Sequence, residues 1–147
     1  MAKYQVRFEQ YFAAPRAKVF AWFGDHEKLA RVWGGRFRRI RDATEGKNPN
    51  GLGSVREVRL GIAKFEETIV KFQAPTVIEY AVTRGSPIKN HLGRLVFADA
   101  DSGTKLDYTI SFDPKLPFTG WLIARILSGQ WRNGVQRAVK DIAQGNS

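Results

Sequence analysis

The stretch WLIARILSGQWRNGVQRAVKDIA, Trp121 to Ala143, predicts one long helix near the end of this chain of 147 residues, with Pro117 opening it. At about 100° per residue, one face of that helix collects Leu127, Gln130 and Gly134. A core-facing helix normally carries bulky apolar residues there, and a mid-helix glycine costs about 1 kcal/mol relative to alanine. Gly134 therefore either admits a closely packed neighbour or borders a cavity, and both interpretations stay open.

Upstream of this helix, alternation of apolar and polar residues predicts seven strands. Links of hairpin length join the last five strands, which indicates an antiparallel meander. Between the first and second strands, Pro15, Asp25 and the glycines that follow each segment bound two short helices. The predicted strands span residues 4–12, 36–42, 54–60, 64–72, 76–84, 91–98 and 105–112.

This order of elements predicts an α+β fold in which a curved, seven-stranded antiparallel sheet surrounds one long C-terminal helix, with two short helices after the first strand. One helix cannot cover seven flat strands, so we expect the sheet to curl and to enclose a volume. The length suits a single domain over residues 1–147.

The composition excludes several kinds of chemistry. The chain has no cysteine, which removes disulfides and thiolate sites. His26 and His91 lack metal-binding spacing, and no phosphate loop or hydrolase motif occurs, so we predict neither a metal nor a cofactor. No segment has the length and apolarity of a transmembrane helix, and no signal peptide follows Met1. A cytoplasmic location is expected.

The net charge of +10 includes a basic cluster, RFRRIR, at residues 36–41. Such a balance is typical of a solvated basic face, and it also suits an anionic partner or an anionic membrane surface. Modules that read single-stranded nucleic acid combine charge with recognisable aromatic motifs, and none is present. We therefore expect no specific nucleic-acid binding.

Five phrases in order carry a family resemblance: FAAPRAKVFAWFGD, GLGSVREVRL, FEETIVKFQAPTVIEYAV, SPIKNHLGRLVF and GTKLDYTISFDPKLP. Together they resemble the SRPBCC family of the START-like, birch-pollen-allergen superfamily, and in particular its polyketide cyclase/dehydrase branch. The resemblance covers nearly the whole chain and implies the helix-grip fold. Its members include aromatase/cyclases, lipid and quinone carriers, hormone receptors and chaperone activators, so it selects no single activity.

The residues of the strands and of the long helix that should face the concave side of the sheet predict the lining of a ligand cavity. Gln10, Tyr80, His91 and Gln130 would supply its polar part. Tyr80 and Tyr108 are also compatible with ordinary core aromatics whose hydroxyls are satisfied locally. The predicted ligand-binding residues are Phe8, Gln10, Phe12, Tyr80, Leu95, Phe97, Tyr108, Ile110, Leu127, Gln130 and Gly134.

No catalytic residue is assigned, but His91, Arg56 and Glu67 are candidates. A two-residue turn at Gly61-Ile62 would place Arg56 opposite Glu67, either as an inward pair that handles a substrate oxygen or as an ordinary surface pair. His91 titrates near neutral pH and could act as an acid or base, although no carboxylate near it in sequence would orient it. His26 is expected at the surface.

We expect the protein to bind an apolar or aromatic small molecule, such as a lipid, polyketide or quinone-like compound, between the sheet and the long helix. One alternative is an aromatase/cyclase-like enzyme that uses His91, Tyr80 or Arg56, and another is a protein-interaction module. A converging histidine or Arg–Glu pair would favour the enzyme, an all-apolar pocket would favour a carrier, and a filled core would favour the interaction module.

Overall fold

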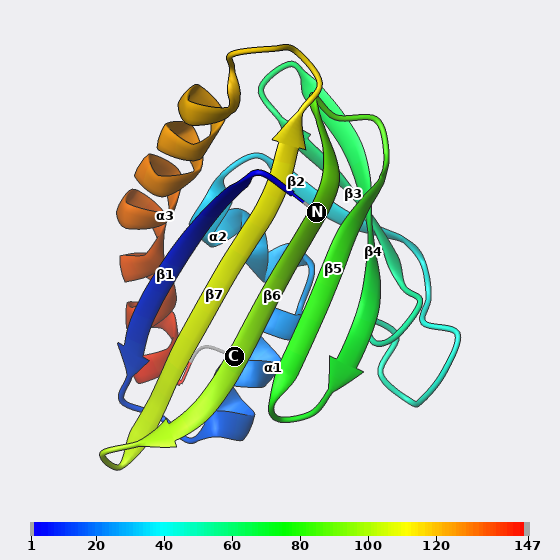
Figure 1. Cartoon of the computed structure of the whole chain (residues 1–147). Helices are drawn as coiled ribbons and strands as arrows, with labels where there is room; N and C mark the ends of the chain where they lie inside the picture. Colours follow the sequence, from blue (N-terminus) through cyan, green and yellow to red (C-terminus); the bar gives the residue numbers. More distant parts are fainter. Residues whose placement is uncertain (1, 146–147) are drawn as a thin grey trace.

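In a computed structural model that describes residues 2–145, seven strands form one antiparallel sheet in the order β1-β7-β6-β5-β4-β3-β2 (Figure 1). This confirms the predicted fold class, because consecutive strands from β2 to β7 are neighbours and β1 pairs with β7. The strands are β1 (Tyr4–Phe12), β2 (Arg36–Arg41), β3 (Val55–Leu60), β4 (Ala63–Gln73), β5 (Val77–Arg84), β6 (Ile88–Ala100) and β7 (Gly103–Pro114).

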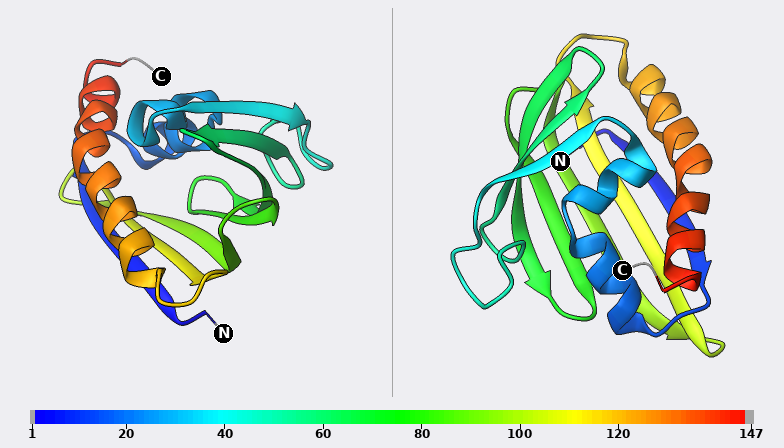
Figure 2. Two further views of the ribbon diagram at one scale, coloured as in Figure 1. Left: turned by 90° about the horizontal axis from the view of Figure 1, so that it is seen from above. Right: turned by 180° about the vertical axis from the view of Figure 1, so that it is seen from behind.

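The helices lie on the concave side of the sheet (Figure 2). They are α1 (Arg16–Gly24), the short turn η1 (Glu27–Leu29) that continues into α2 (Ala30–Trp33), and the long α3 (Gly120–Ala143). Asp25, the predicted cap of the second short helix, accepts a hydrogen bond at Oδ1 from the Glu27 N–H at 3.0 Å, although the cap position of the turn itself is His26. The long helix begins at Gly120 rather than at Pro117, since Phe118 has a φ of 66°, which is not helical.

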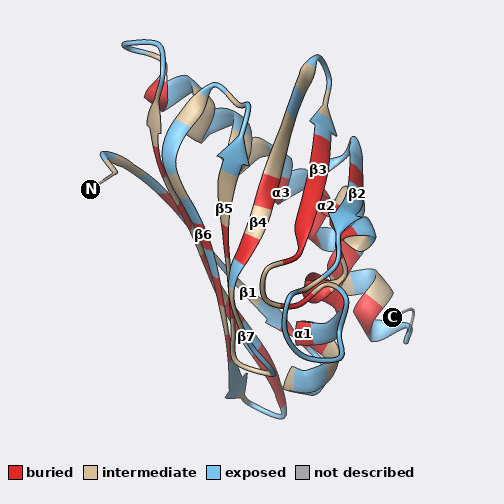
Figure 3. Cartoon of the chain, turned by 90° about the vertical axis from the view of Figure 1, so that its right-hand side faces the viewer, coloured by how far each residue is buried: buried red, intermediate tan, exposed pale blue. Residues whose placement is uncertain are grey.

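Aromatic side chains fill the end of the concave face that α1 covers. The Phe97 ring lies 5.2 Å from Phe20 and 6.1 Å from Phe23, and Phe12 lies 5.6 Å from Phe23, all between ring centroids. In Figure 3, buried segments, coloured red, occur in α1 and along the strands of the sheet. These rings pack against one another and form the part of the core beneath α1.

The second half of α3 closes tightly against α2. A Cβ atom at Gly134 would lie 1.8 Å from the Val32 carbonyl oxygen, so only glycine allows this approach. The expectation that Gly134 borders a cavity is therefore wrong, and its other interpretation, close packing, is right. By contrast, none of residues 121–130 is buried. This first half of α3 contacts the core only through the half-buried residues Ile123, Ala124 and Leu127, over the other end of the sheet.

The sheet opens between β5 and β6 toward that same end. The ladder between the two strands runs from Val77–Val96 to Tyr80–Gly93. Further along, the Val82 N–H donates to the Nδ1 atom of His91 at 3.1 Å. The imidazole therefore satisfies a backbone donor where the two strands separate, and it turns toward the interior.

Candidate functional site

A cavity of about 80 Å³ lies between strands β2–β7 and the first half of α3. Its walls are mostly apolar and enclose a small set of polar side chains. This volume is below the roughly 300–1,000 Å³ of typical ligand pockets, so a larger ligand requires half-buried wall residues to move outward. The lining residues are Trp33, Phe37, Arg56, Val58, Leu60, Phe65, Glu67, Tyr80, Val82, Ile88, His91, Ile110 and Leu127.

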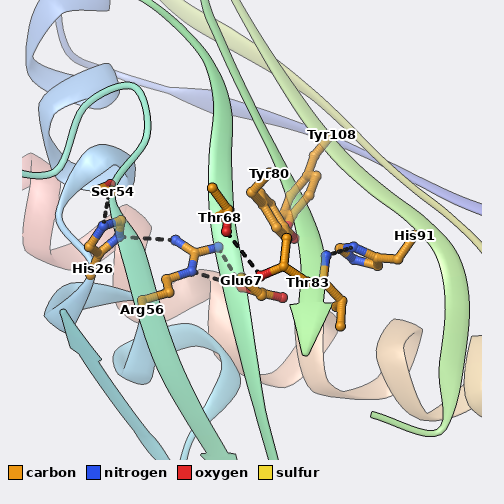
Figure 4. Close-up of polar contacts among 10 residues, drawn as sticks. His26, Ser54, Arg56, Glu67, Thr68, Tyr80, Thr83, His91 and Tyr108 are labelled. Atoms are coloured by element: carbon orange, nitrogen blue, oxygen red, sulfur yellow. Dashed lines mark hydrogen bonds and ion pairs between the residues drawn. The ribbon is translucent and has the colours of Figure 1, made fainter. Parts of the chain in front are cut away.

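Arg56 and Glu67 form an ion pair inside this cavity (Figure 4). They sit opposite each other in the β3–β4 ladder, as the two-residue turn predicts, and they are only 3% and 6% exposed. Glu67 Oε1 accepts from Arg56 Nε at 2.8 Å and from Nη2 at 2.7 Å. The inward alternative is therefore the correct one for this pair.

His26 is part of the same polar network, contrary to the expectation that it lies at the surface. It is 1% exposed, and its Nδ1 atom accepts from Arg56 Nη1 at 3.2 Å. Its Nε2 atom lies 3.0 Å from the Ser54 Oγ atom, to which it donates as the neutral tautomer. Burial and the neighbouring Arg56 and Arg39 charges lower the pKa of His26 to about 3, so the ring is neutral at pH 7.

Two tyrosines form the floor of the site behind the ion pair. The Arg56 guanidinium carbon lies 4.5 Å from the centroid of the Tyr80 ring, a cation–π contact. The hydroxyl groups of Tyr80 and Tyr108 form a hydrogen bond with each other. Burial raises the pKa of both tyrosines well above the ordinary value, so both stay protonated. Tyr80 thus connects the guanidinium to the aromatic core.

His91 approaches the cavity from the other side of Tyr80, with the two ring centroids 5.3 Å apart. Burial lowers the pKa of His91, while the Glu67 charge opposes this shift and the Arg56 charge adds to it. Because Nδ1 accepts from the backbone of Val82, the neutral ring carries its proton on Nε2. His91 is therefore placed as a hydrogen-bond donor to the cavity rather than as a base.

The predicted ligand-binding residues fall into three groups. Tyr80, Ile110 and Leu127 line the cavity, as do the candidates Arg56, Glu67 and His91, and Tyr108 lies directly behind Tyr80. By contrast, Phe12, Leu95 and Phe97 are buried in the core and do not line the cavity.

The remaining four residues lie away from the cavity, and one of them is Gly134, which packs against the Val32 carbonyl. Phe8 stacks on Trp131, with ring centroids 5.0 Å apart, and with Gln10 it borders a groove between β1 and α3. Gln130 is exposed, because the first half of α3 turns this side chain to the outside. The expected inward orientation of Gln130 is wrong.

Several wall residues were missed although strand alternation pointed to them. Val58 and Leu60 share the inward phase of Arg56, Phe65 shares that of Glu67, and Val82 shares that of Tyr80. An inward-facing ion pair implies, by the same alternation along each strand, that these neighbours face the cavity as well. Trp33 and Phe37 come from α2 and the edge strand β2, and nothing in the local sequence pattern links them to this site.

The site combines donors and acceptors in a setting with no net charge. Arg56 and Glu67 balance each other, and both histidines are neutral. Glu67 Oε2 accepts no hydrogen bond from the described residues, while the Nε2–H of His91 is available as a donor. Within residues 2–145, no cluster of three or more potential metal ligands was found. These groups suit a ligand that is apolar overall and carries a hydroxyl or carbonyl group.

A curved antiparallel sheet that grips a long helix, with a mostly apolar cavity and a few converging polar groups between them, defines the helix-grip class of domains. Residues 3–144 match the family model described as polyketide cyclase / dehydrase and lipid transport. The chain therefore belongs to this SRPBCC family. The description covers both catalysis and transport, so membership leaves the ligand open.

Solved structures show the same fold at low sequence identity. A START superfamily protein from Mycobacterium smegmatis superposes with a TM-score of 0.78 at 13% identity, covering 95% of this chain and 97% of the other. A protein from Thermobifida fusca gives 0.72 at 21% identity, with 95% and 93% covered. Ara h 8.0201 gives 0.65 at 18% identity, with 94% and 98% covered. No curated protein sequence matches the chain significantly.

Proposed function

We propose that the cavity binds a small apolar or aromatic molecule that carries a hydroxyl or carbonyl group, with lipids, polyketides and quinone-like compounds as the candidate classes. The observation that carries this proposal is the buried Arg56–Glu67 pair inside an apolar cavity. A buried ion pair is costly to desolvate and adds little net stability compared with apolar packing. Its position on the cavity wall is therefore better explained by ligand recognition than by stability.

The polar groups define how such a ligand sits. A ligand hydroxyl donates to Glu67 Oε2, and a carbonyl oxygen accepts from His91 Nε2–H. Apolar residues of β3, β4 and β5 enclose the rest of the molecule. An unpaired polar group on the ligand would lose its water without compensation, so these contacts select among apolar ligands of similar size.

A matched pair of substitutions tests this function. Val82→Phe fills the cavity wall, whereas Val70→Phe makes the same change at an exposed position of β4. Titration with a neutral apolar fluorophore should show at least about a tenfold loss of affinity for Val82→Phe and unchanged affinity for Val70→Phe. Equal binding by both variants would place the fluorophore elsewhere and refute the proposal. Native mass spectrometry of protein purified from its own cells would then identify a copurified ligand.

An enzymatic function is the second candidate, favoured by the presence of Glu67 Oε2 and His91 Nε2–H in one cavity. In a carbonyl substrate, Glu67 would take a proton from the carbon next to the carbonyl group. The C–H electron pair would then form the enolate, whose oxygen accepts hydrogen bonds from His91. Proton return to carbon, or attack of the enolate on a second carbonyl group, would complete the reaction.

Deuterium exchange separates the enzyme from the carrier. An aryl β-diketone in deuterium oxide should exchange its activated protons faster with the parent protein than with Glu67→Gln, while His91→Gln retains partial activity. If the parent protein exchanged these protons no faster than buffer does, while still binding the fluorophore, only the carrier function would remain supported.

The third alternative, an interaction module, needs a filled core, and the cavity argues against it. A cytoplasmic location stays a prediction from the sequence.

A further inference from the structure

Large apolar side chains are exposed mainly at one end of the molecule. Phe118 is 91% exposed and Trp121 is 60% exposed. Single exposed apolar residues are normal on protein surfaces, whereas a group of them marks an interaction site. We call this group the mouth patch, and it consists of Ile62, Leu116, Phe118, Trp121, Leu122 and Ile126.

The mouth patch lies at the end of the molecule where the cavity is found. The β3–β4 turn carries Ile62, and the β7–α3 loop carries Phe118; both are at the top in Figure 1 and in the right panel of Figure 2. Ile126 adjoins the wall residue Leu127, and Leu60 of the wall lies two residues before Ile62. The patch therefore occupies the rim of the candidate ligand site.

The backbone at Phe118 adopts a conformation that is energetically unfavourable for this residue. Its φ of 66° is unusual for a bulky residue, and a hydrogen bond of 2.7 Å from Thr119 Oγ1 to the Leu116 carbonyl holds the turn. Burial of the ring does not compensate for this conformation, because the ring points to solvent. Strain of this kind is found where a function needs the exposed side chain.

Basic residues accompany the patch. Lys115 precedes Leu116, Arg125 lies next to Ile126, and Arg84 and Lys89 flank the β5–β6 loop at the same end. All four side chains are exposed, and none takes part in an ion pair within residues 2–145. Among the acidic groups of this end, Asp113 accepts from Asn90 and from the Lys3 N–H, and Glu66 is half-buried. The rim is thus both apolar and positively charged.

We propose that this end of the protein docks on an anionic lipid bilayer, with Phe118 and Trp121 in the interfacial region and the basic residues at the headgroups. Protruding aromatic and aliphatic side chains beside lysine and arginine fit a bilayer interface, which accepts convex apolar groups and attracts cations. Docking in this orientation would turn the rim of the cavity toward the bilayer. The inference rests on the proposed function for its purpose, ligand exchange with the membrane, but not for the binding itself.

Vesicle binding tests the docking surface directly. The parent protein should sediment with phosphatidylcholine vesicles that contain phosphatidylglycerol and much less with vesicles that lack it. Trp121 is the exposed one of the four tryptophans, so its emission should shift to shorter wavelength on binding, and Trp121→Phe should remove this shift. Brominated lipids should quench the same signal.

Matched variants locate the contact. Phe118→Asn with Ile62→Asn should weaken vesicle binding by about tenfold or more, whereas Val70→Asn with Ile40→Asn, two exposed positions outside the patch, should not. Lys115→Gln with Arg125→Gln should cost about 25-fold, since each cation near an anionic leaflet contributes about fivefold. Lys47→Gln with Lys140→Gln changes the net charge equally and should have much less effect.

The outcomes separate this inference from the proposed function. Val82→Phe, which fills the cavity, should still bind vesicles, so failure of ligand binding leaves docking intact. Absence of sedimentation, sedimentation without the Trp121 shift, or equal losses in patch and control variants would overturn the docking surface. Concentration-dependent dimerisation that Phe118→Asn abolishes would assign the patch to a second copy of this chain and would also overturn it.

Discussion

At the scale of single residues, the site contains a buried ion pair, Arg56 and Glu67, that adds little net stability compared with apolar packing. Arg56 contacts Glu67, His26 and the ring of Tyr80, so its charge is compensated from three sides. Removal of one partner leaves an uncompensated group in an apolar setting, which costs more than the pair itself contributes. Stability measurements therefore report whether the pair is as buried as its contacts indicate.

Glu67→Leu should lower the free energy of unfolding by about 3–5 kcal/mol, because the Arg56 guanidinium stays buried without its counter-ion. The double variant Arg56→Met with Glu67→Leu should recover most of that loss, since two apolar side chains of similar size replace the pair. Urea denaturation midpoints of the parent, both single variants and the double variant measure the coupling. Small, additive losses would place the pair in contact with bulk water instead.

At the scale of elements, the two halves of α3 have different roles. The second half buries Trp131, Val135, Ala138 and Ile142 and is fixed to α2 through Gly134. The first half buries no side chain, although it carries several apolar residues. The second half anchors the helix, and we expect the first half, whose apolar residues are half-buried or exposed, to move outward when a ligand larger than the cavity enters.

Gly134→Ala should destabilise the protein by about 1–3 kcal/mol or more, despite the gain in helix propensity, because its Cβ would overlap the Val32 carbonyl. Gly129→Ala is the matched control on the same helix, since its Cβ would meet no atom closer than 3.9 Å. That variant should gain up to about 1 kcal/mol. Thermal and urea denaturation of both variants check the signs, and a stabilised Gly134→Ala would mean that α2 and α3 do not cross closely.

At the scale of the whole molecule, the neutral histidines couple folding to pH. His26 has a pKa of about 3 in the folded state against 6.5 when unperturbed. Between these values the unfolded chain binds a proton that the folded chain does not, so stability rises with pH. The contribution of His26 is complete above about pH 6.5 and is lost as the pH falls toward 3. The lowered pKa of His91 acts in the same direction.

Lowering the pH from 7 to 4 should therefore reduce the free energy of unfolding, with His26 contributing up to about 3–4 kcal/mol. His26→Gln keeps a polar group near Ser54 and Arg56 but does not titrate, so its stability should depend less on pH over this range. Urea denaturation at several pH values compares the two proteins. Parallel curves for parent and variant would show that His26 is hydrated and titrates normally in the folded state.

The sequence by itself determined the order of elements, the seven-stranded sheet and its connections, because these follow from local periodicity, turn residues and hairpin-length links. A two-residue turn at Gly61-Ile62 predicts the register of Arg56 against Glu67, and the structure contains that turn. These features depend on residues that are close in the chain. Local patterns are therefore sufficient to predict them.

Only the tertiary structure decided which concave residues line the cavity. Phe12 and Phe97 have the same inward phase as Tyr80, yet Phe20 and Phe23 of α1 pack over them, whereas no residue of the first half of α3 is buried over Tyr80. It likewise buried His26 beside Arg56 and brought the Val32 carbonyl against Gly134. The physical reason is that periodicity fixes the direction of a side chain relative to its own element. What the side chain meets depends on elements that are distant in sequence.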